Sequence, residues 1–486
     1  MKKYLLGIDV GTTGTKTMLF TEDGSCIAHA YQGYPTQTPH VGWSEQNPLD
    51  WWQAVVDTVR KVCDGNQNVV AISLSVQGGT TVPVDDQYQP VRPAMVWNDS
   101  RCETQKQQFA ENYGADAMYR KTGWHLFGGM NAMQIRWMKD NEPENFQKTA
   151  MFLSVPDYIA YKMTGIAALD PSNIGINQLG NITQKRYDPE ILQFAGVTEE
   201  KLPKIIPSGT VIGHLTADAA KELGLCESCV LVAGAHDQYA VALGAGAVND
   251  GDILIGSGTC WVVTCIRNDP DFDSGLSQSV SAVPGKWGSL RSLSSGGVCL
   301  DWIRQKVLSA ENGLLSYEEI NEETAKHKAA EEGLFFYPFS GISSEGKELT
   351  KATFTGLDLS HNKFHPIRAV MEGVVFQIVW MMEAFHAKPS EDGLILSGGA
   401  SKSKLWTQLL ADISGYPIRI PELPDLACVG AAILAGMGAG LYESAAQGCK
   451  AFAVNARTVY PDPAAARQYR QLLNTYKRKA KALEDA

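Results

Sequence analysis

Strand-like and helix-like patterns alternate along the first third of the chain. Apolar and β-branched runs at residues 4–9, 17–21 and 27–32, separated by glycine-containing turns, predict three strands of a β meander. Asn47 followed by Pro48 is typical of a helix start. The apolar residues that follow at helical spacing are Trp52, Val55, Val56, Val59 and Cys63. We interpret this stripe as the core-facing side of a helix.

Two nearly continuous apolar runs, at residues 69–74 and 230–235, are typical of strands covered on both faces. In open α/β sheets, ligands bind at the carboxyl ends of the strands. The residues that follow the two runs, 77–79 and 236–238, are therefore candidates for a binding site.

After about residue 247 the opening pattern returns. A run at 253–256, a Gly-Ser-Gly-Thr turn at 256–259 and a second run at 261–265 repeat the order of strand, turn and strand. This echo indicates two similarly built domains facing one another across a cleft, and we predict domains at 1–246 and 247–486. Helices are expected at residues 367–385, 404–413 and from 463 onward.

Composition excludes several classes of protein. With 486 residues, the chain is too long for a single core. A net charge of −11 leaves no broad basic surface, which argues against nucleic acid as the main partner. No apolar run reaches membrane-spanning length and the N-terminus lacks a signal-peptide core, so we expect a cytoplasmic protein without a membrane partner. Cys226 and Cys229 form the only CxxC, which we interpret as a surface turn because no second ligand pair follows.

The segment at residues 7–16 places a carboxylate, Asp9, before a glycine turn lined by hydroxyls. Glycines allow backbone N–H groups to approach an anion, so we predict that Thr12, Thr13 and Lys16 bind nucleotide phosphates. Asp9 would hold a hydrated Mg²⁺. Neither the P-loop spacing nor the dinucleotide fingerprint is present, and an ordinary glycine hairpin remains the alternative interpretation.

The second turn adds a matching candidate site. Its residues Gly256, Ser257, Gly258 and Thr259 are predicted to contact phosphate. Two such hairpins, one from each domain, resemble the arrangement of actin-like (ribonuclease H-like) ATPases, which implies an α/β fold with two such domains. A predicted strand that ends before a helix lets an adenine lie against bare backbone at Gly398, Gly399, Ala400 and Lys402. The small residues at 428–432 are interpreted as close helix packing.

Further motifs are spread along the chain: Gly42-Trp43-Ser44-Glu45-Gln46, Trp51-Trp52, residues 92–101, Pro156-Asp157-Tyr158, residues 234–238, Thr355-Gly356-Leu357 and residues 369–373. Together with residues 9–16, they resemble the FGGY carbohydrate kinase family over nearly the whole chain, and within it xylulose kinases most. The resemblance implies ATP-dependent phosphorylation of a small sugar or polyol. Family members are often dimers, so a homodimer is also expected.

Asp237 is the candidate base. A hydroxyl becomes a good nucleophile when a carboxylate accepts its proton, and Asp237 follows an apolar strand. A helix-capping aspartate is the alternative from local sequence, whereas the family resemblance implies the proton acceptor. His236 is expected to point to the opposite side, because neighbouring strand residues alternate. We predict that Gln77, Gly78, Gly79, Trp97, Asp99 and Asp237 contact the substrate.

The chain departs from the family pattern at Gln134, where a lysine is usual, and at Pro366, where an apolar residue is usual. Xylulose kinases resemble Gln-Met-His-Gly in the substrate loop, and glycerol kinases carry Arg-Glu after the glutamine, whereas this chain has Gly78 and Gly79. D-xylulose or a related ketose is the expected substrate. Other pentuloses, glycerol, erythritol, gluconate and a signalling furanone stay open, as does a non-kinase actin-like ATPase.

Overall fold

The computed structural model describes residues 2–64, 68–308, 314–339, 341, 351–452 and 456–484. Its first sheet has six strands in the order β13 (Val211–His214), β14 (Val230–His236), β5 (Val69–Val76), β1 (Tyr4–Val10), β2 (Gly14–Thr21) and β3 (Cys26–Gly33). The three strands β14, β5 and β1 run parallel, and the outer pairs are antiparallel. The predicted meander is therefore confirmed as one side of a mixed sheet.

The second sheet has seven strands in the order β17 (Ser277–Val280), β18 (Trp287–Leu293), β16 (Trp261–Arg267), β15 (Ile253–Ser257), β21 (Leu394–Gly398), β22 (Ile418–Pro421) and β23 (Ala456–Val459). Its inner strands repeat the first sheet, because β22, β21 and β15 run parallel while β16 and β23 are antiparallel to their neighbours. The echo in the sequence corresponds to this shared topology, and the predicted two-domain α/β class is confirmed.

By their internal contacts, the residues form two compact units. The first comprises Met1–Val248, Ile266–Ser289 and Leu423–Val454, and the second comprises Asn249–Cys265, Leu290–Glu422 and Asn455–Ala486. The segment 423–454 thus packs with the N-terminal part of the chain, although it lies far beyond residue 247. The division into domains 1–246 and 247–486 stays a prediction.

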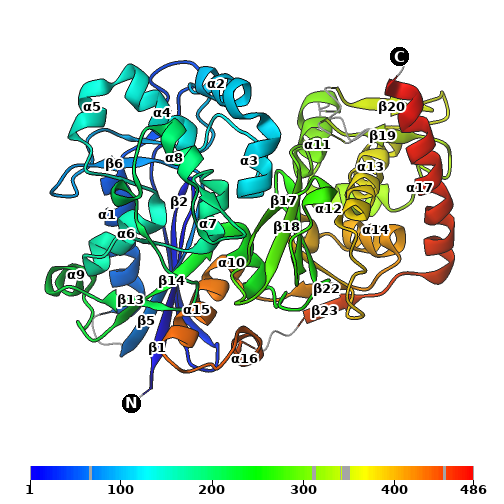
Figure 1. The fold of residues 1–486 in the computed structure, drawn as a ribbon. Coiled ribbons are helices and arrows are strands. Elements are labelled where there is room, and N and C mark those ends of the chain that lie inside the picture. Colours follow the sequence, from blue (N-terminus) through cyan, green and yellow to red (C-terminus); the bar gives the residue numbers. More distant parts are fainter. Residues whose placement is uncertain are drawn as a thin grey trace. The chain divides into compact units, whose positions relative to one another are not determined.

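Helices cover both faces of the first sheet. α1 (Pro48–Cys63) and α6 (Val155–Thr164) pack on one face, and α10 (Asp237–Gly244) and α15 (Leu426–Gly438) pack on the other. The remaining helices of the first unit are α2 (Glu103–Tyr113), α3 (Ala115–Thr122), α4 (Asn131–Asn141), α5 (Pro143–Lys148), α7 (Pro171–Ile176), α8 (Pro189–Ala195), α9 (Ala217–Leu223) and α16 (Ala445–Ala451). As predicted, Asn47 caps α1 by accepting a hydrogen bond from Leu49 N–H. Figure 1 shows α1 in blue and α15 in orange.

The strand β1 divides the core of the first unit. Its side chains alternate, so Leu6 packs with α1 in one apolar cluster and Leu5 packs with α15 in another. Gly7 lies on the α15 side, where an added Cβ would be 1.9 Å from the carbonyl oxygen of Cys428. Only glycine permits this close approach of strand and helix. Asp9, two residues on, therefore faces the N-terminus of α15.

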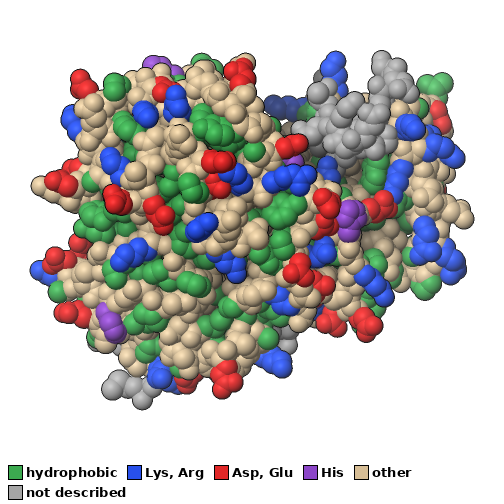
Figure 2. Space-filling model, viewed as in Figure 1, with side chains coloured by type: hydrophobic (Ala, Val, Ile, Leu, Met, Phe, Trp, Pro, Cys, Tyr) green, Lys and Arg blue, Asp and Glu red, His purple; other side chains and the backbone are tan. Residues whose placement is uncertain are grey.

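The helices of the second unit are α11 (Gly297–Trp302), α12 (Tyr317–Thr324), α13 (Phe364–Met382), α14 (Lys404–Ser414) and α17 (Pro463–Glu484). α13 packs against α14, and α14 packs against α17, which is red in Figure 1. None of the described helices combines the length and apolar content needed to cross a bilayer. Charged side chains of both signs are interspersed over the face shown in Figure 2.

Candidate active site

The carboxyl ends of β1, β5 and β14 bring three candidate segments together in the first unit. Asp9 pairs in register with Ser75 on β5, and His236 at the end of β14 pairs with Val76. The N–H of Gln77 donates to the carbonyl of Val10 at 3.1 Å. Asp9, the loop at 77–79 and Asp237 therefore lie at one edge of the sheet, as the apolar runs predicted.

Asp9 belongs to a cluster with Lys16 and Asp425. Its Oδ1 accepts a hydrogen bond from Ser75 Oγ at 2.8 Å, and its Oδ2 lies 4.0 Å from Lys16 Nζ. The same Nζ donates to Asp425 Oδ2 at 2.8 Å. Burial raises the pKa of the Asp9 carboxyl to about 7, and the neighbouring Asp425 carboxylate adds to the rise.

Asp425 was not predicted from the sequence. It caps α15, because its side chain accepts from Cys428 N–H at 3.1 Å. An aspartate before a run of small helix-forming residues is a recognisable capping signal. Its position beside Asp9 depends on the contact between α15 and β1, which no local pattern reveals.

These carboxylates suit Mg²⁺ by donor type. Mg²⁺ takes oxygen ligands and is usually held by one or two carboxylates together with substrate phosphates and water. Asp9 and Asp425 place two carboxylates beside the Lys16 ammonium. Among the described residues there is no closed cage of three or more acidic, histidine or cysteine ligands.

The predicted phosphate-binding residues of the first hairpin differ in their surroundings. The hydroxyl of Thr12 donates to Gln77 Oε1 at 2.9 Å and accepts from Trp97 Nε1 at 3.1 Å. Thr13 is exposed, and its carbonyl accepts from Tyr31 Oη at 3.1 Å. Thr12 thus contacts the loop at 77–79, whereas Thr13 and about half of the Lys16 side chain are exposed.

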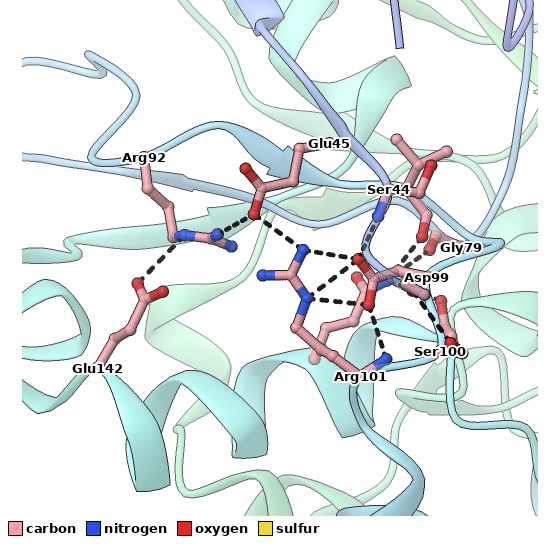
Figure 3. A network of polar contacts seen from close by, with 12 residues as sticks. Ser44, Glu45, Gly79, Arg92, Asp99, Ser100, Arg101 and Glu142 are labelled. Carbon is pink, nitrogen blue, oxygen red and sulfur yellow. Dashed lines mark hydrogen bonds and ion pairs between the residues drawn. The ribbon is translucent and has the colours of Figure 1, made fainter. Parts of the chain in front are cut away.

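Asp99 lies in a buried ion-pair network rather than in open space (Figure 3). Its carboxylate accepts from Ser44 N–H at 2.7 Å and from Arg101 Nη2 at 2.6 Å, and its side chain has no exposed surface. Arg101 also pairs with Glu45 at 2.8 Å and lies 3.6 Å above the ring of Trp43. This geometry argues against a substrate contact by Asp99. Its carboxylate instead stabilises the loop that carries Trp97.

Gly78 and Gly79, in the loop at 77–79, lie against side chains. Gly79 has a φ of +72°, its N–H donates to Asn177 Oδ1 at 3.0 Å, and an added Cβ would meet Met130 Sδ at 2.5 Å. Gln134, which departs from the family pattern, donates from Nε2 to the carbonyl of Gly129 at 2.7 Å. Gln134 therefore stabilises the surrounding loops through its amide.

Asp237 is the first residue of α10, and His236 is the residue before the helix. About one third of the Asp237 side chain is exposed, but its Oδ1 is buried. His236 Nε2 lies 3.3 Å from that oxygen. The expectation that the two side chains point to opposite sides is wrong, because strand alternation ends where the helix begins.

In the second unit, the other hairpin and the glycine turn after β21 line one cavity of about 530 Å³. Ser257 Oγ donates to the carbonyl of Ser397 at 2.5 Å and accepts from Ala400 N–H at 3.1 Å, which fixes the two loops together. The cavity is lined by Ser257, Gly258, Thr259, Trp261, Gly297, Leu300, Asp301, Tyr317, Ile320, Asn321, Gly399, Ala400, Lys402, Ser403 and Trp406. Its volume is in the range of small-molecule sites.

Most lining residues on α12 and α14 were not predicted, since they line the cavity only through tertiary packing. Asn321 is an example, because its Oδ1 accepts from Ser403 Oγ at 2.6 Å beside the predicted turn. The predicted site residues Gly256 and Gly398 are not among the lining residues. In the strand ladders, Gly256 pairs with Val262 and Gly398 pairs with Ser257.

Comparison with known proteins agrees with this arrangement. Models of the N-terminal and C-terminal domains of the FGGY family of carbohydrate kinases match residues 4–244 and 252–439. The chain is 28% identical to a xylulose kinase of Bacillus subtilis over 98% of this chain and 96% of that protein. It is also 28% identical to a gluconokinase of the same organism, over 91% and 89%. The crystal structure of a gluconate kinase from Lactobacillus acidophilus has the same fold, with a TM-score of 0.90 at 24% identity over 99% and 98% of the chains.

Proposed function

The chain belongs to the FGGY family of carbohydrate kinases and is an ATP-dependent phosphotransferase acting on a sugar, and we propose that Asp237 is its catalytic base. The observation that carries this proposal is the position of Asp237. The Asp237 carboxylate is partly exposed, and it lies at the carboxyl end of β14, next to the loop at 77–79. No other carboxylate named in the sequence prediction has this combination, since Asp99 is fully paired and Asp9 faces Lys16.

In the proposed reaction, Asp237 accepts the proton of a sugar hydroxyl. The hydroxyl oxygen forms a bond to the γ-phosphorus of ATP while the bond from that phosphorus to the β,γ-bridging oxygen breaks, which releases ADP. Gln77, Gly78, Gly79 and Trp97 orient the sugar. Thr13 and Lys16 with Gly256, Ser257, Gly258 and Thr259 bind phosphates, and Gly398, Gly399, Ala400 and Lys402 contact the adenine. Asp9 would hold Mg²⁺, which neutralises phosphate charge when bound.

For the substrate, we propose D-xylulose or a related ketose, with gluconate as the second candidate. Relatives named xylulose kinase and gluconokinase are equally similar in sequence, at 28% identity. An assay of ADP formation over a panel of D-xylulose, L-xylulose, gluconate, glycerol and erythritol distinguishes them. A ketose with the highest kcat/KM supports the first candidate, and gluconate with the highest value supports the second.

The base is tested with Asp237→Asn. This variant keeps the shape of the side chain but removes the proton acceptor, so kcat is expected to fall about 10²–10⁴-fold. Binding of ATP, measured by calorimetry, is expected to stay unchanged. Near-normal turnover would remove Asp237 from the mechanism, and ADP formation that needs no sugar would favour a non-kinase ATPase.

A further inference from the structure

Gly78 and His236 are coupled by shape. A Cβ added to Gly78 would lie 2.9 Å from His236 Cδ2 and 2.8 Å from Ile176 Cγ2. Real Cβ atoms do not come this close, so any larger residue at position 78 displaces the imidazole or Ile176. The bare backbone of the substrate loop therefore makes room for a histidine supplied by the end of β14.

The pose of His236 is fixed by its surroundings. Its backbone N–H donates to Ser172 Oγ at 2.8 Å, and Ser172 in turn is held by Asp170, which caps α7. The aromatic rings of Trp124 and Tyr239 lie 6.2 and 5.8 Å from the imidazole between centroids. With only 5% of its side chain exposed, His236 has little freedom to turn elsewhere.

The polar atoms of His236 and Asp237 are incompletely used. Oδ1 of Asp237 lies 3.3 Å from Nε2 of His236, but neither Oδ1 nor Nδ1 of the histidine has a hydrogen-bond partner, and both atoms are buried. Buried polar atoms are ordinarily paired. Since one third of the Asp237 side chain is exposed while Oδ1 is not, its open oxygen is Oδ2.

We propose that His236 is a positioning residue whose Nε2–H, 3.3 Å from Oδ1 of Asp237, restrains that oxygen so that Oδ2 faces the sugar hydroxyl. This inference rests on the proposed role of Asp237 as base. The close fit to Gly78 fixes the position of the imidazole relative to the loop at 77–79.

The test compares His236→Ala with His236→Gln, because the glutamine Nε2 can place an amide donor near the lost imidazole donor. In the alanine variant, kcat is expected to fall about 10–100-fold, as for other residues that orient a functional group. The KM for ATP is expected to stay unchanged, and the glutamine variant is expected to recover most of the rate. His29→Gln, an exposed histidine on β3, is the matched control.

A second variant covers the case in which His236→Ala fails to fold. Gly78→Ala crowds both the imidazole and Ile176, and it is expected to lower kcat while the KM for ATP stays unchanged. A kcat within about twofold of wild type in His236→Ala, or in Gly78→Ala where His236→Ala fails to fold, overturns the inference. Wild-type protein without sugar-dependent ADP formation would instead refute the proposed function, so the two failures are distinguishable.

Discussion

Asp425 and Asp99 show what the sequence leaves open at single residues, because Asp425 was not predicted and Asp99 was predicted to contact the substrate. Both are acidic residues beside recognisable motifs, yet Asp425 joins Lys16 and Asp9 at the sheet edge while Asp99 is enclosed by Arg101 and Ser44. Sequence identified Asp9 and Asp237 because strand ends are local features. It could not distinguish an open carboxylate from a buried, paired one, because pairing depends on segments far apart in the chain.

At this scale, Asp9→Asn tests the proposed metal ligand. Asparagine keeps the shape but removes a negative charge, so the Mg²⁺ concentration for half-maximal rate is expected to rise about tenfold or more, a change of ~1.4 kcal/mol or more in binding free energy. Titration of the rate with Mg²⁺ at fixed ATP measures it. Asp57→Asn on the exposed face of α1 is the control. An unaltered Mg²⁺ dependence would count against Asp9.

The helix α6 depends on a buried cap. Both oxygens of Asp157 are used in its capping box with Ser154, and Ser154 N–H donates to Oδ2 at 2.7 Å. Burial raises the pKa of the Asp157 carboxyl to about 7, against the opposing effect of these hydrogen bonds. Pro156-Asp157-Tyr158 was identified in the sequence as a family motif, and the structure gives it a physical role as a helix start.

The raised pKa of Asp157 predicts a pH-dependent stability. Between its ordinary value of 3.8 and about 7, the unfolded chain has released the proton and the folded chain has kept it, so the free energy of unfolding falls as pH rises. From pH 5 to pH 8 this loss is about 2–3 kcal/mol, and Asp157→Asn is expected to remove it. Urea unfolding at both pH values measures the difference. Asp218→Asn on α9 controls for loss of a charge, and equal pH dependence in wild type and Asp157→Asn would contradict the prediction.

Strand β1 and helix α15 predict a second effect at the scale of elements. Gly7→Ala places a methyl group against the Cys428 carbonyl and is expected to cost about 1–3 kcal/mol of stability through overpacking. Thermal unfolding measures this cost. Gly33→Ala on β3, whose added Cβ would make only ordinary contacts of 3.5 Å or more, is the control and is expected to stay near wild type. Equal melting temperatures for the two variants would disprove the close approach.

At the scale of the molecule, the two sheets repeat one topology, and each places a glycine-rich loop after the corresponding parallel strand. The loop at 77–79 follows β5, and the turn at 398–402 follows β21. The sequence predicted this duplication from two hairpins alone. It did not predict that residues 423–454 return to the first unit, because their apolar pattern indicates a buried helix without indicating which sheet covers it.

This return predicts the behaviour of a fragment. A chain ending at residue 248 lacks α15, which covers one face of β1, β5 and β14, so the apolar cluster around Leu5, Val232 and Tyr239 would be exposed. We expect this fragment to bind the dye ANS and to unfold without a cooperative transition. Addition of residues 423–454 through a flexible linker is expected to restore part of the cooperativity. Cooperative unfolding of the short fragment would contradict the assignment of α15 to its core.

The late return of α15 also has a consequence during synthesis. The strand β1 is synthesised long before α15, because the helix that covers it is encoded more than 400 residues later. At about 5–20 residues per second, that interval lasts roughly 20–80 seconds. During this interval, the face of the nascent sheet that α15 later covers stays exposed. Chaperones that bind exposed apolar segments are therefore expected to bind this face.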